Sequence, residues 1–439
     1  MRFTMSNGAA VTELLIVAGV LAFIAERRRW RPPLWAALTV GLGFRLQALL
    51  LTHMTKPYDI FNDYRVVGRS VLLHQDPILH IRPSGWSYLP PYDFVLAGEV
   101  ELQRYLHISW LYAGRSFSLV ADLAVIVLIG VVAGAETGAL RRFQYACYPI
   151  AIYNSLGRME ATCLALMLAA LALVLRRDPP ISTRRALGSG ALLGLAAGVN
   201  SWPILFLPAL LRALPSRRAR LEAALGLATV VGGLFVTMPL TVGTPVRDLP
   251  RDAWAMLTYH ATSGTWGWSA VVGFVYRLHW YSPASRLIGT VGSLVTLAAV
   301  VAAVWWWRRA HPLDLASVAP CALLATTASF GSQYLMWPVA SLLARPPKRA
   351  WWFHASVNTW SIVLIELPAF PGYLGHPADR YLTMASLLVI LAIIVAMPWD
   401  RRTAFAAVKP PVTTERTGVP GSAPGTVQPV SGQPTINPG

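Results

Sequence analysis

Asp63 is the residue whose type and position best suit catalysis, because it lies in a long polar stretch between two apolar segments. The residues after it place apolar or small side chains at helical spacing: Val66, Val67, Ser70, Val71 and Leu72. Arg65 and Arg69 lie on the opposite side, which predicts an amphipathic helix in a membrane interface with Asp63 in its first turn. A carboxylate there can act as a general base toward a hydroxyl group. It can equally cap the helix, because the helix macrodipole favours a negative charge at that end.

Basic side chains that could hold a phosphate group form a second set of candidates. Arg158 comes first, because a guanidinium group suits bidentate contacts with phosphate oxygens. Arg69, Arg251 and His260 are lesser candidates. Arg158 lies at the expected tip of a helical hairpin, where it could instead be solvated or paired with Glu160.

Polar side chains in the same segments form a candidate substrate pocket: Tyr64, Tyr88, Tyr259, Gln333 and Tyr334. Tyr259 could also form an interfacial pair with His260, because both residue types favour the headgroup region of a membrane. Gln333 and Tyr334 lie at an expected hairpin bend, which they could simply cap.

The sequence carries no motif for a metal or a common cofactor. It has no HExxH, no GxGxxG that opens a helix, and no Walker loop. Cys147, Cys163 and Cys321 lie in apolar stretches without metal-ligand spacing, so we expect them to be small buried side chains. No protein metal site is therefore predicted.

The composition excludes a soluble globular protein. Hydrophobic residues make up 55% and charged residues 13% of the 439 positions, whereas a soluble domain carries about 25% charged residues. The net charge of +17 would suggest nucleic acid as a partner of a soluble chain. Here the basic residues form short clusters between apolar stretches, which is typical of membrane topology signals. The clusters are Arg27–Arg31, Arg141–Arg142, Arg176–Arg185, Arg212–Arg220, Arg308–Arg309, Arg345–Arg349 and Arg401–Arg402.

An even number of membrane crossings must join these clusters if all of them face the cytoplasm. We therefore predict an all-α polytopic membrane protein, a bundle of about 11–13 transmembrane helices within residues 1–400, with the amino terminus outside. The clearest segments are 9–25, 34–52, 110–133, 143–156, 160–175, 221–240 and 287–307. Residues 401–439 are rich in Pro, Gly, Ser and Thr, and we expect a disordered cytoplasmic tail.

Three connections stand out in this topology. The expected extracytoplasmic loops 53–109 and 241–285 are long, and long loops commonly carry function. Residues 185–212 are too short for two full crossings at ~1.5 Å per residue. They form either a re-entrant hairpin broken at Trp202–Pro203, or a segment whose flanking arginines do not both face the cytoplasm.

Short motifs along the chain resemble those of the GT-C glycosyltransferases, which are multi-spanning enzymes that use polyprenyl-phosphate sugars. The matching segments are Asp63-Tyr64, Asp76-Pro77 and Trp86–Pro91, then Tyr148–Glu160, Gly194–Pro203 and Ser332–Pro338, in the order of that class. Arg45, inside the preceding helix, also has counterparts in many members. The resemblance spans residues 35–400 and points to GPI mannosyltransferase I and to the bacterial polyprenyl-phosphomannose-dependent mannosyltransferases.

The chain departs from the family pattern at three positions. Phe61 stands where GPI mannosyltransferase I carries the first acid of an asp-x-asp pair, Arg158 stands for a glutamine, and Asn200 for a lysine. The resemblance thus leaves Asp63 as a single catalytic base. It makes no cofactor certain and leaves a divalent metal ion open.

The resemblance implies an extracytoplasmic mannosyltransferase in the bacterial cytoplasmic (inner) membrane. This polyprenyl-phosphate-sugar-dependent hexosyltransferase would transfer a sugar to a cell-envelope glycolipid, glycan or protein acceptor. The anomeric carbon would be inverted, since one carboxylate suffices for direct attack. Its partners would be the lipid donor, the acceptor and membrane lipid, and not nucleic acid.

Two other functions stay open. A lipid-linked-sugar transporter or flippase would place charges along a membrane pathway, and Arg45, Arg115 and Asp122 lie within predicted helices. Arg115 and Asp122 could also simply pair with each other. A noncatalytic subunit of an envelope complex could have the same fold.

Overall fold

The described part of the chain is helical throughout. The computed structural model describes residues 5–52, 63–80, 86, 88–155, 159–175, 181–257, 266–276, 282–366 and 377–401. These residues contain no β-strand. The predicted cytoplasmic tail after residue 401 lies outside them.

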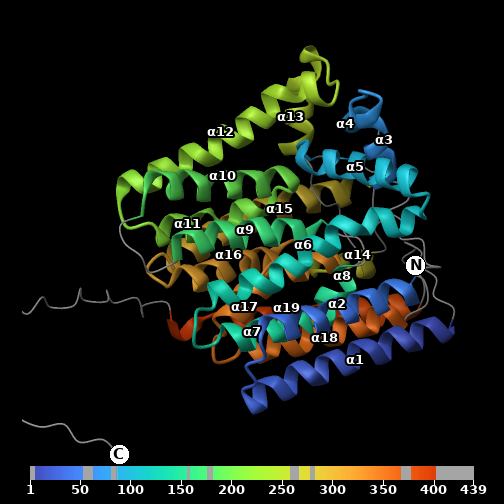
Figure 1. The fold of residues 1–439 in the computed structure, drawn as a ribbon, viewed down its shortest axis with the longest axis vertical. Coiled ribbons are helices and arrows are strands. Elements are labelled where there is room, and N and C mark those ends of the chain that lie inside the picture. The colour runs from blue at the N-terminus through green and yellow to red at the C-terminus, as the bar shows by residue number, and fades with distance from the viewer. Residues whose placement is uncertain are drawn as a thin grey trace, which may run out of the picture. The chain divides into compact units, whose positions relative to one another are not determined.

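Five helices are long and apolar enough to cross a membrane, as expected for an all-α polytopic membrane protein. They are α1 (Met5–Arg28), α2 (Leu34–Leu51), α6 (Trp110–Val132), α12 (Arg217–Thr241) and α15 (Pro283–Trp306). The bundle also contains the helices α9 (Glu160–Leu175), α10 (Thr183–Val199), α16 (Pro312–Thr326), α18 (Ala350–Glu366) and α19 (Pro377–Ala396). These helices run back and forth side by side (Figure 1).

The segments that carry arginine clusters gather at one end of this bundle, on the left of Figure 1. We call it the arginine end; it holds residues 27–31, 141–142, 217–220, 308–309 and 345–349. The opposite end, the loop end, carries α3 (Arg65–Leu72), α4 (Pro77–His80), α5 (Pro91–Leu106) and α13 (Leu249–Leu257). The described parts of both long connections predicted from the sequence therefore lie opposite the basic clusters.

Three passes are interrupted by proline-containing turns. The hairpin predicted near Trp202–Pro203 is confirmed, because α10 ends at Val199 and the chain returns through η2 (Trp202–Phe206) and α11 (Leu207–Ala213). The other two interruptions separate α7 (Gly138–Ala146) from α8 (Pro149–Asn154), and η4 (Ser332–Met336) from α17 (Val339–Ala344). One continuous helix over 143–156 was therefore a wrong prediction. Its physical reason is Pro149, which holds the preceding Tyr148 in an extended conformation with ψ 114°.

Glycines bring the backbones of α10 and α12 into close contact. A Cβ on Gly190 would lie 1.8 Å from the carbonyl oxygen of Ala223, and one on Gly226 would lie 2.3 Å from that of Leu187. Small residues at such crossings let membrane helices pack without large side chains between them.

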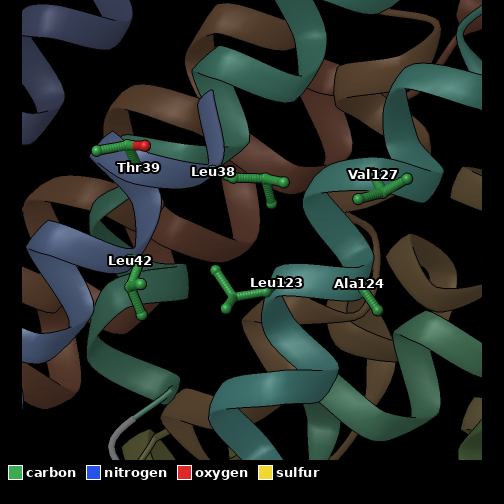
Figure 2. Close-up of a pocket in the computed structure, with 6 residues that line it drawn as sticks. All are labelled: Leu38, Thr39, Leu42, Leu123, Ala124 and Val127. Atoms are coloured by element: carbon green, nitrogen blue, oxygen red, sulfur yellow. The ribbon is translucent and has the colours of Figure 1, made fainter. Parts of the chain in front are cut away.

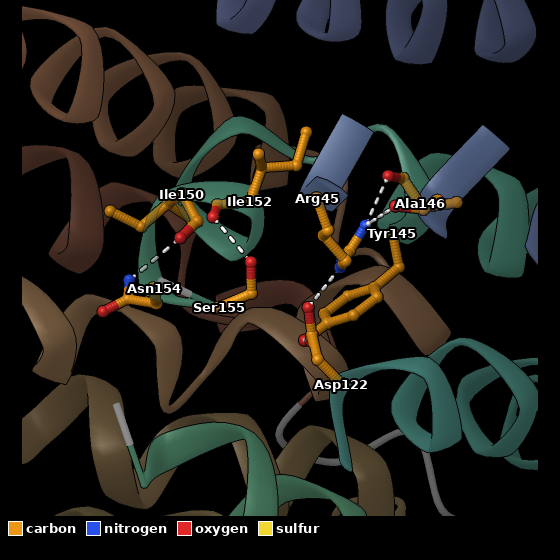
Figure 3. Close-up of polar contacts among 9 residues, drawn as sticks. Arg45, Asp122, Tyr145, Ala146, Ile150, Ile152, Asn154 and Ser155 are labelled. Carbon is orange, nitrogen blue, oxygen red and sulfur yellow. Dashed lines mark hydrogen bonds and ion pairs between the residues drawn. The ribbon is translucent and has the colours of Figure 1, made fainter. Parts of the chain in front are cut away.

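A buried ion pair joins α2 to α6. Arg45 donates from Nε to Asp122, and its Nη1 donates to the carbonyl oxygens of Gly41 (3.0 Å) and Ala146 (2.9 Å). The Tyr145 hydroxyl donates to the other Asp122 oxygen at 2.6 Å. Figure 3 shows these side chains converging from three helices. Both carboxylate oxygens of Asp122 are thus occupied, and Arg45 fixes the register of α2 against α6.

The amphipathic helix predicted after Asp63 is α3, but its buried face differs from the prediction. Val67, Ser70 and Val71 are buried, whereas Val66 and Leu72 are 40% and 41% exposed. Because α3 is only two turns long, fewer than the five predicted side chains lie on its buried face.

Asp63 lies in the helical turn that leads into α3. The N-cap position of α3 belongs to Tyr64, which makes no side-chain capping hydrogen bond. The alternative role of Asp63 as a helix cap stays a prediction.

Candidate active site at the loop end of the bundle

Aromatic packing fixes the backbone next to Asp63. Asp63 is half-buried, whereas Tyr64 is 4% exposed. The Tyr64 ring meets Trp86 and Tyr92 edge-on, with ring centroids 6.0 Å and 5.8 Å away. Burial raises the pKa of Tyr64 well above its usual value, so its hydroxyl stays protonated. Tyr64 is thus a packed side chain that positions the backbone next to Asp63, and its role in a substrate pocket stays a prediction.

Residues 86 and 88–91 form one side of the aromatic cluster around Tyr64. Trp86 donates from Nε1 to Asp93 at 2.9 Å, and Tyr88 packs edge-on against the Trp86 ring at 4.9 Å. Asp93 lies in the first turn of α5, where the helix dipole favours a carboxylate. Burial nevertheless raises the pKa of Asp93 well above its usual range. Tyr88 stays half-buried and remains a candidate for contact with substrate.

Segments far apart in the sequence meet around this cluster. Glu160, the first residue of α9, is buried and interacts electrostatically with Tyr64, and the backbone of Met159 hydrogen-bonds to Tyr64. Asn200 donates from Nδ2 to the sulfur of Met159 at 3.5 Å. Three of the motifs noted in the sequence therefore touch one another through Tyr64, Met159 and Asn200.

The fourth motif joins through an aromatic stack. Trp202 of η2 stacks on Trp337, with ring centroids 4.7 Å apart and an interplanar angle of 7°. Tyr334 of η4 lies 4.5 Å from the Trp337 ring. Gln333 and Tyr334 are half-buried there. The interruptions after α10 and before α17 therefore place polar aromatic side chains within the helical bundle, where irregular backbone is tolerated if protein encloses it.

Of the predicted phosphate-binding residues, the structure describes Arg69 and Arg251. Arg69 on α3 and Arg251 on α13 are exposed. Arg158, Tyr259 and His260 lie outside the described residues.

A pair of buried carboxyl groups, which was not predicted from the sequence, joins the two long connections. Asp76, just before α4, is buried and accepts from the backbone N–H of Ile78 at 2.9 Å. Asp252 on α13 has no exposed surface and faces Asp76. Burial, and then the charge of Asp76, raise the pKa of Asp252 from 3.8 to about 7, against a smaller lowering by Arg251. In the sequence Asp252 follows Arg251 and lies four residues after Asp248, and nothing there pairs it with Asp76.

We expect this carboxyl pair to make stability depend on pH. The folded protein binds the Asp252 proton more tightly than the unfolded chain does, so this stabilisation is complete below about pH 4 and is lost as pH rises toward about pH 7. Asp252→Asn removes the titration, and its melting temperature should therefore change less between about pH 5 and pH 8 than that of the wild type. Thermal melts of both proteins in detergent measure this. Parallel curves would contradict the pairing.

A glycine allows the same two connections to touch. Gly243 has φ +75°, and a Cβ there would lie 2.0 Å from the carbonyl oxygen of His74. We predict that Gly243→Ala lowers the free energy of unfolding by about 1–3 kcal/mol, through backbone strain and this clash. Gly98→Ala, in α5 with open space around it, is the control and should stabilise by roughly 0.5–1 kcal/mol. Equal melting temperatures for the two variants would contradict the contact.

An apolar pocket lies away from this polar cluster. Figure 2 shows it between α2 and α6, and its volume is about 360 Å³. Its lining is Leu38, Thr39, Leu42, Leu123, Ala124 and Val127. Such a lining suits hydrocarbon and supplies no group for acid–base chemistry. Among the described residues, no three or more His, Cys, Asp or Glu side chains are grouped so that they could hold a metal ion.

A bundle of apolar helices with irregular, polar connections at one end suits a membrane enzyme, and a comparison with known families agrees with this geometry. A family model described as glycosyltransferase family 87 matches residues 102–330, more than half of the 439-residue chain. The matched range begins after Asp63 and ends before Gln333. No curated protein and no solved structure matches the chain. The chain therefore belongs to glycosyltransferase family 87, a family of GT-C-type membrane glycosyltransferases.

Proposed function

We propose that this glycosyltransferase moves a hexose, mannose in the first instance, from a polyprenyl phosphate to a hydroxyl group of a cell-envelope glycolipid, glycan or protein. The observation that carries the proposal is the position of Asp63. It is a half-buried carboxylate at the loop end, next to a tyrosine held by three other segments of the chain.

The reaction needs one base and one good leaving group. Asp63 takes the proton of the acceptor hydroxyl while that oxygen attacks the anomeric carbon of the sugar. The bond from this carbon to the phosphate oxygen breaks, and polyprenyl phosphate leaves with the electron pair. Attack from the face opposite the leaving group inverts the anomeric carbon, and a single carboxylate is enough. Tyr88, Gln333 and Tyr334 are the half-buried side chains that we assign to the sugar and acceptor.

The charge distribution supports an orientation in the bacterial cytoplasmic membrane. Arginine clusters favour the cytoplasmic side, so the loop end would face outward. A lipid-linked sugar presented in the outer leaflet would then reach Asp63 directly.

The charges within the helices were the main support for the transporter alternative, and most of that support is lost. Arg45 and Asp122 bind each other, which accounts for both charges without a substrate. The noncatalytic alternative predicts that even the wild-type protein transfers no sugar.

Purified protein in lipid vesicles tests the function. Polyprenyl-phosphate-[³H]mannose, the glucose counterpart and a nucleotide mannose are each offered with extracted envelope glycolipids as acceptors. We expect labelled product from a polyprenyl-phosphate donor and none from the nucleotide sugar. Transfer from the nucleotide sugar alone would overturn the donor class, and preference for the glucose donor would overturn mannose.

A further inference from the structure

Besides Arg45, the bundle contains a second buried arginine, Arg115. One side of its guanidinium group is hydrogen-bonded, and the other side has no partner among the described residues. It is the sixth residue of α6 and is 1% exposed. Its Nη1 donates to the hydroxyl oxygen of Thr52, at the end of α2, at 3.2 Å. Its Nε and Nη2 have no hydrogen-bond partner in the part of the chain that the structure describes. The possible pairing of Arg115 with Asp122 is wrong, since Asp122 binds Arg45 and Tyr145.

The two unpartnered donors lie on the same edge of the guanidinium group and can together bind one ligand. Nε–H and Nη2–H of a guanidinium group point in the same direction, and this edge fits two oxygens of one phosphate or carboxylate. A buried cation without a counter-charge is strongly unfavourable. An arginine retained in that state within a membrane bundle therefore points to an anionic ligand.

Among the residues that the structure describes, the neighbouring acids do not supply the missing charge. Glu99 of α5 is the acid beside this part of α6, and it accepts from the backbone N–H of Phe117 at 3.1 Å. Burial raises the pKa of Glu99 to about 8, so it is mostly neutral at pH 7. Asp122 lies seven residues further along α6, about 10 Å away by helical rise, and its charge is matched by Arg45.

The side of α6 that carries Arg115 is connected to the Asp63 region through Ser118. Ser118 is one helical turn further and shares this side. The Tyr92 hydroxyl is 3.2 Å from the Ser118 hydroxyl, and the Tyr92 ring packs against Tyr64. Ser118 thus contacts Tyr92, and Tyr92 contacts Tyr64. These two contacts connect this side of α6 to the residue next to Asp63.

We propose that Arg115, held in place by Thr52, binds the phosphate group of the lipid carrier through Nε and Nη2. This inference rests on the proposed function and assigns the phosphate to a residue outside the four predicted from the sequence. Exposed cations such as Arg69 and Arg251 are screened by water and salt, whereas Arg115 acts in a low-dielectric surrounding. There it would hold the donor before transfer and stabilise the charge that develops on the departing phosphate.

Ligand binding to detergent-solubilised full-length protein tests the site without any sugar transfer. The probes are farnesyl phosphate, inorganic phosphate and farnesol, and the variants are Arg115→Gln, Arg115→Lys and Arg115→Met. We expect farnesyl phosphate to bind the wild type and to bind Arg115→Gln about 10- to 150-fold more weakly. Arg115→Lys should recover part of the affinity, because it keeps the charge and loses the two-donor edge. Arg104→Gln, which removes an exposed cation of α5, should leave binding unchanged.

Thermal stability separates a ligand site from a structural role. Arg115→Met removes an uncompensated buried charge, so the unliganded variant should melt at or above the wild-type temperature. The rise in melting temperature that farnesyl phosphate gives the wild type should be lost in this variant. If Arg115→Met melts far below the wild type, or if Arg115→Gln binds farnesyl phosphate as the wild type does, the proposal is wrong.

The remaining outcomes show which part of the proposal is wrong. Equal binding of inorganic phosphate and farnesyl phosphate would show a site for free phosphate and overturn the lipid carrier as its ligand. Binding of farnesol as tight as farnesyl phosphate would overturn phosphate recognition. Loss of farnesyl phosphate binding in Arg115→Gln, with no sugar transfer by the wild type, would support the phosphate site while refuting the proposed function.

Discussion

Asp63→Asn should abolish sugar transfer while leaving the fold intact. Asparagine has nearly the same size as aspartate but cannot accept the proton of the acceptor hydroxyl, so we expect the rate to fall about 10²- to 10⁴-fold. The side chain is half-buried and the substitution keeps its size, so the free energy of unfolding should change by less than about 1 kcal/mol. Initial rates and thermal melts on the same preparation measure both effects.

Glu101→Gln is the matched control for this variant. Glu101 is a carboxylate of α5 with a 49% exposed side chain, and its contact with Arg104 is long at 3.7 Å. This variant should transfer sugar at the wild-type rate. Full activity of Asp63→Asn would remove Asp63 from the mechanism. A noncatalytic subunit would show no transfer in the wild type either.

Arg45→Ala should lower the stability of the protein more than either Asp63→Asn or Gly243→Ala does. It leaves Asp122 as a buried charge with only the Tyr145 hydroxyl as a partner. Removing one partner of a buried ion pair costs about 3–5 kcal/mol. We expect the variant to accumulate poorly in membranes and to melt well below the wild type in detergent.

The combined variant Arg45→Met, Asp122→Leu, Tyr145→Phe is the control for this prediction. It replaces the whole polar network with apolar side chains of similar size, which can be nearly neutral. Its melting temperature should recover much of the loss seen in Arg45→Ala. Wild-type stability of Arg45→Ala itself would show that the ion pair does not join α2 to α6.

Long apolar segments with clear ends could be predicted closely from the sequence. The predicted segment 160–175 is α9, and the predicted segments 34–52 and 110–133 differ from α2 and α6 by one residue at one end. Hydrophobic length and arginine clusters decide these elements locally. The interruption at Trp202 was also visible, because Pro203 follows it in a stretch too short for two crossings.

The site was harder to predict because its contacts are between distant segments. Asp63 could be chosen from its position before an amphipathic pattern. Asp252 and Arg115 could not, because their chemistry depends on burial against Asp76 and Thr52, which only the packing of helices decides. The burial of Tyr64 could not be predicted for the same reason, because its ring packs edge-on against Trp86 and Tyr92.

Sidedness of transfer in sealed membrane vesicles is the decisive measurement for a catalytic carboxylate at the loop end. Cells expressing the protein yield right-side-out and inverted vesicles, and polyprenyl-phosphate-[³H]mannose is loaded into both membranes. A water-soluble glycan acceptor is added only outside. The proposed orientation predicts labelled acceptor from right-side-out vesicles and none from sealed inverted vesicles until detergent opens them. Transfer by sealed inverted vesicles alone would place Asp63 on the cytoplasmic side and contradict the proposed function.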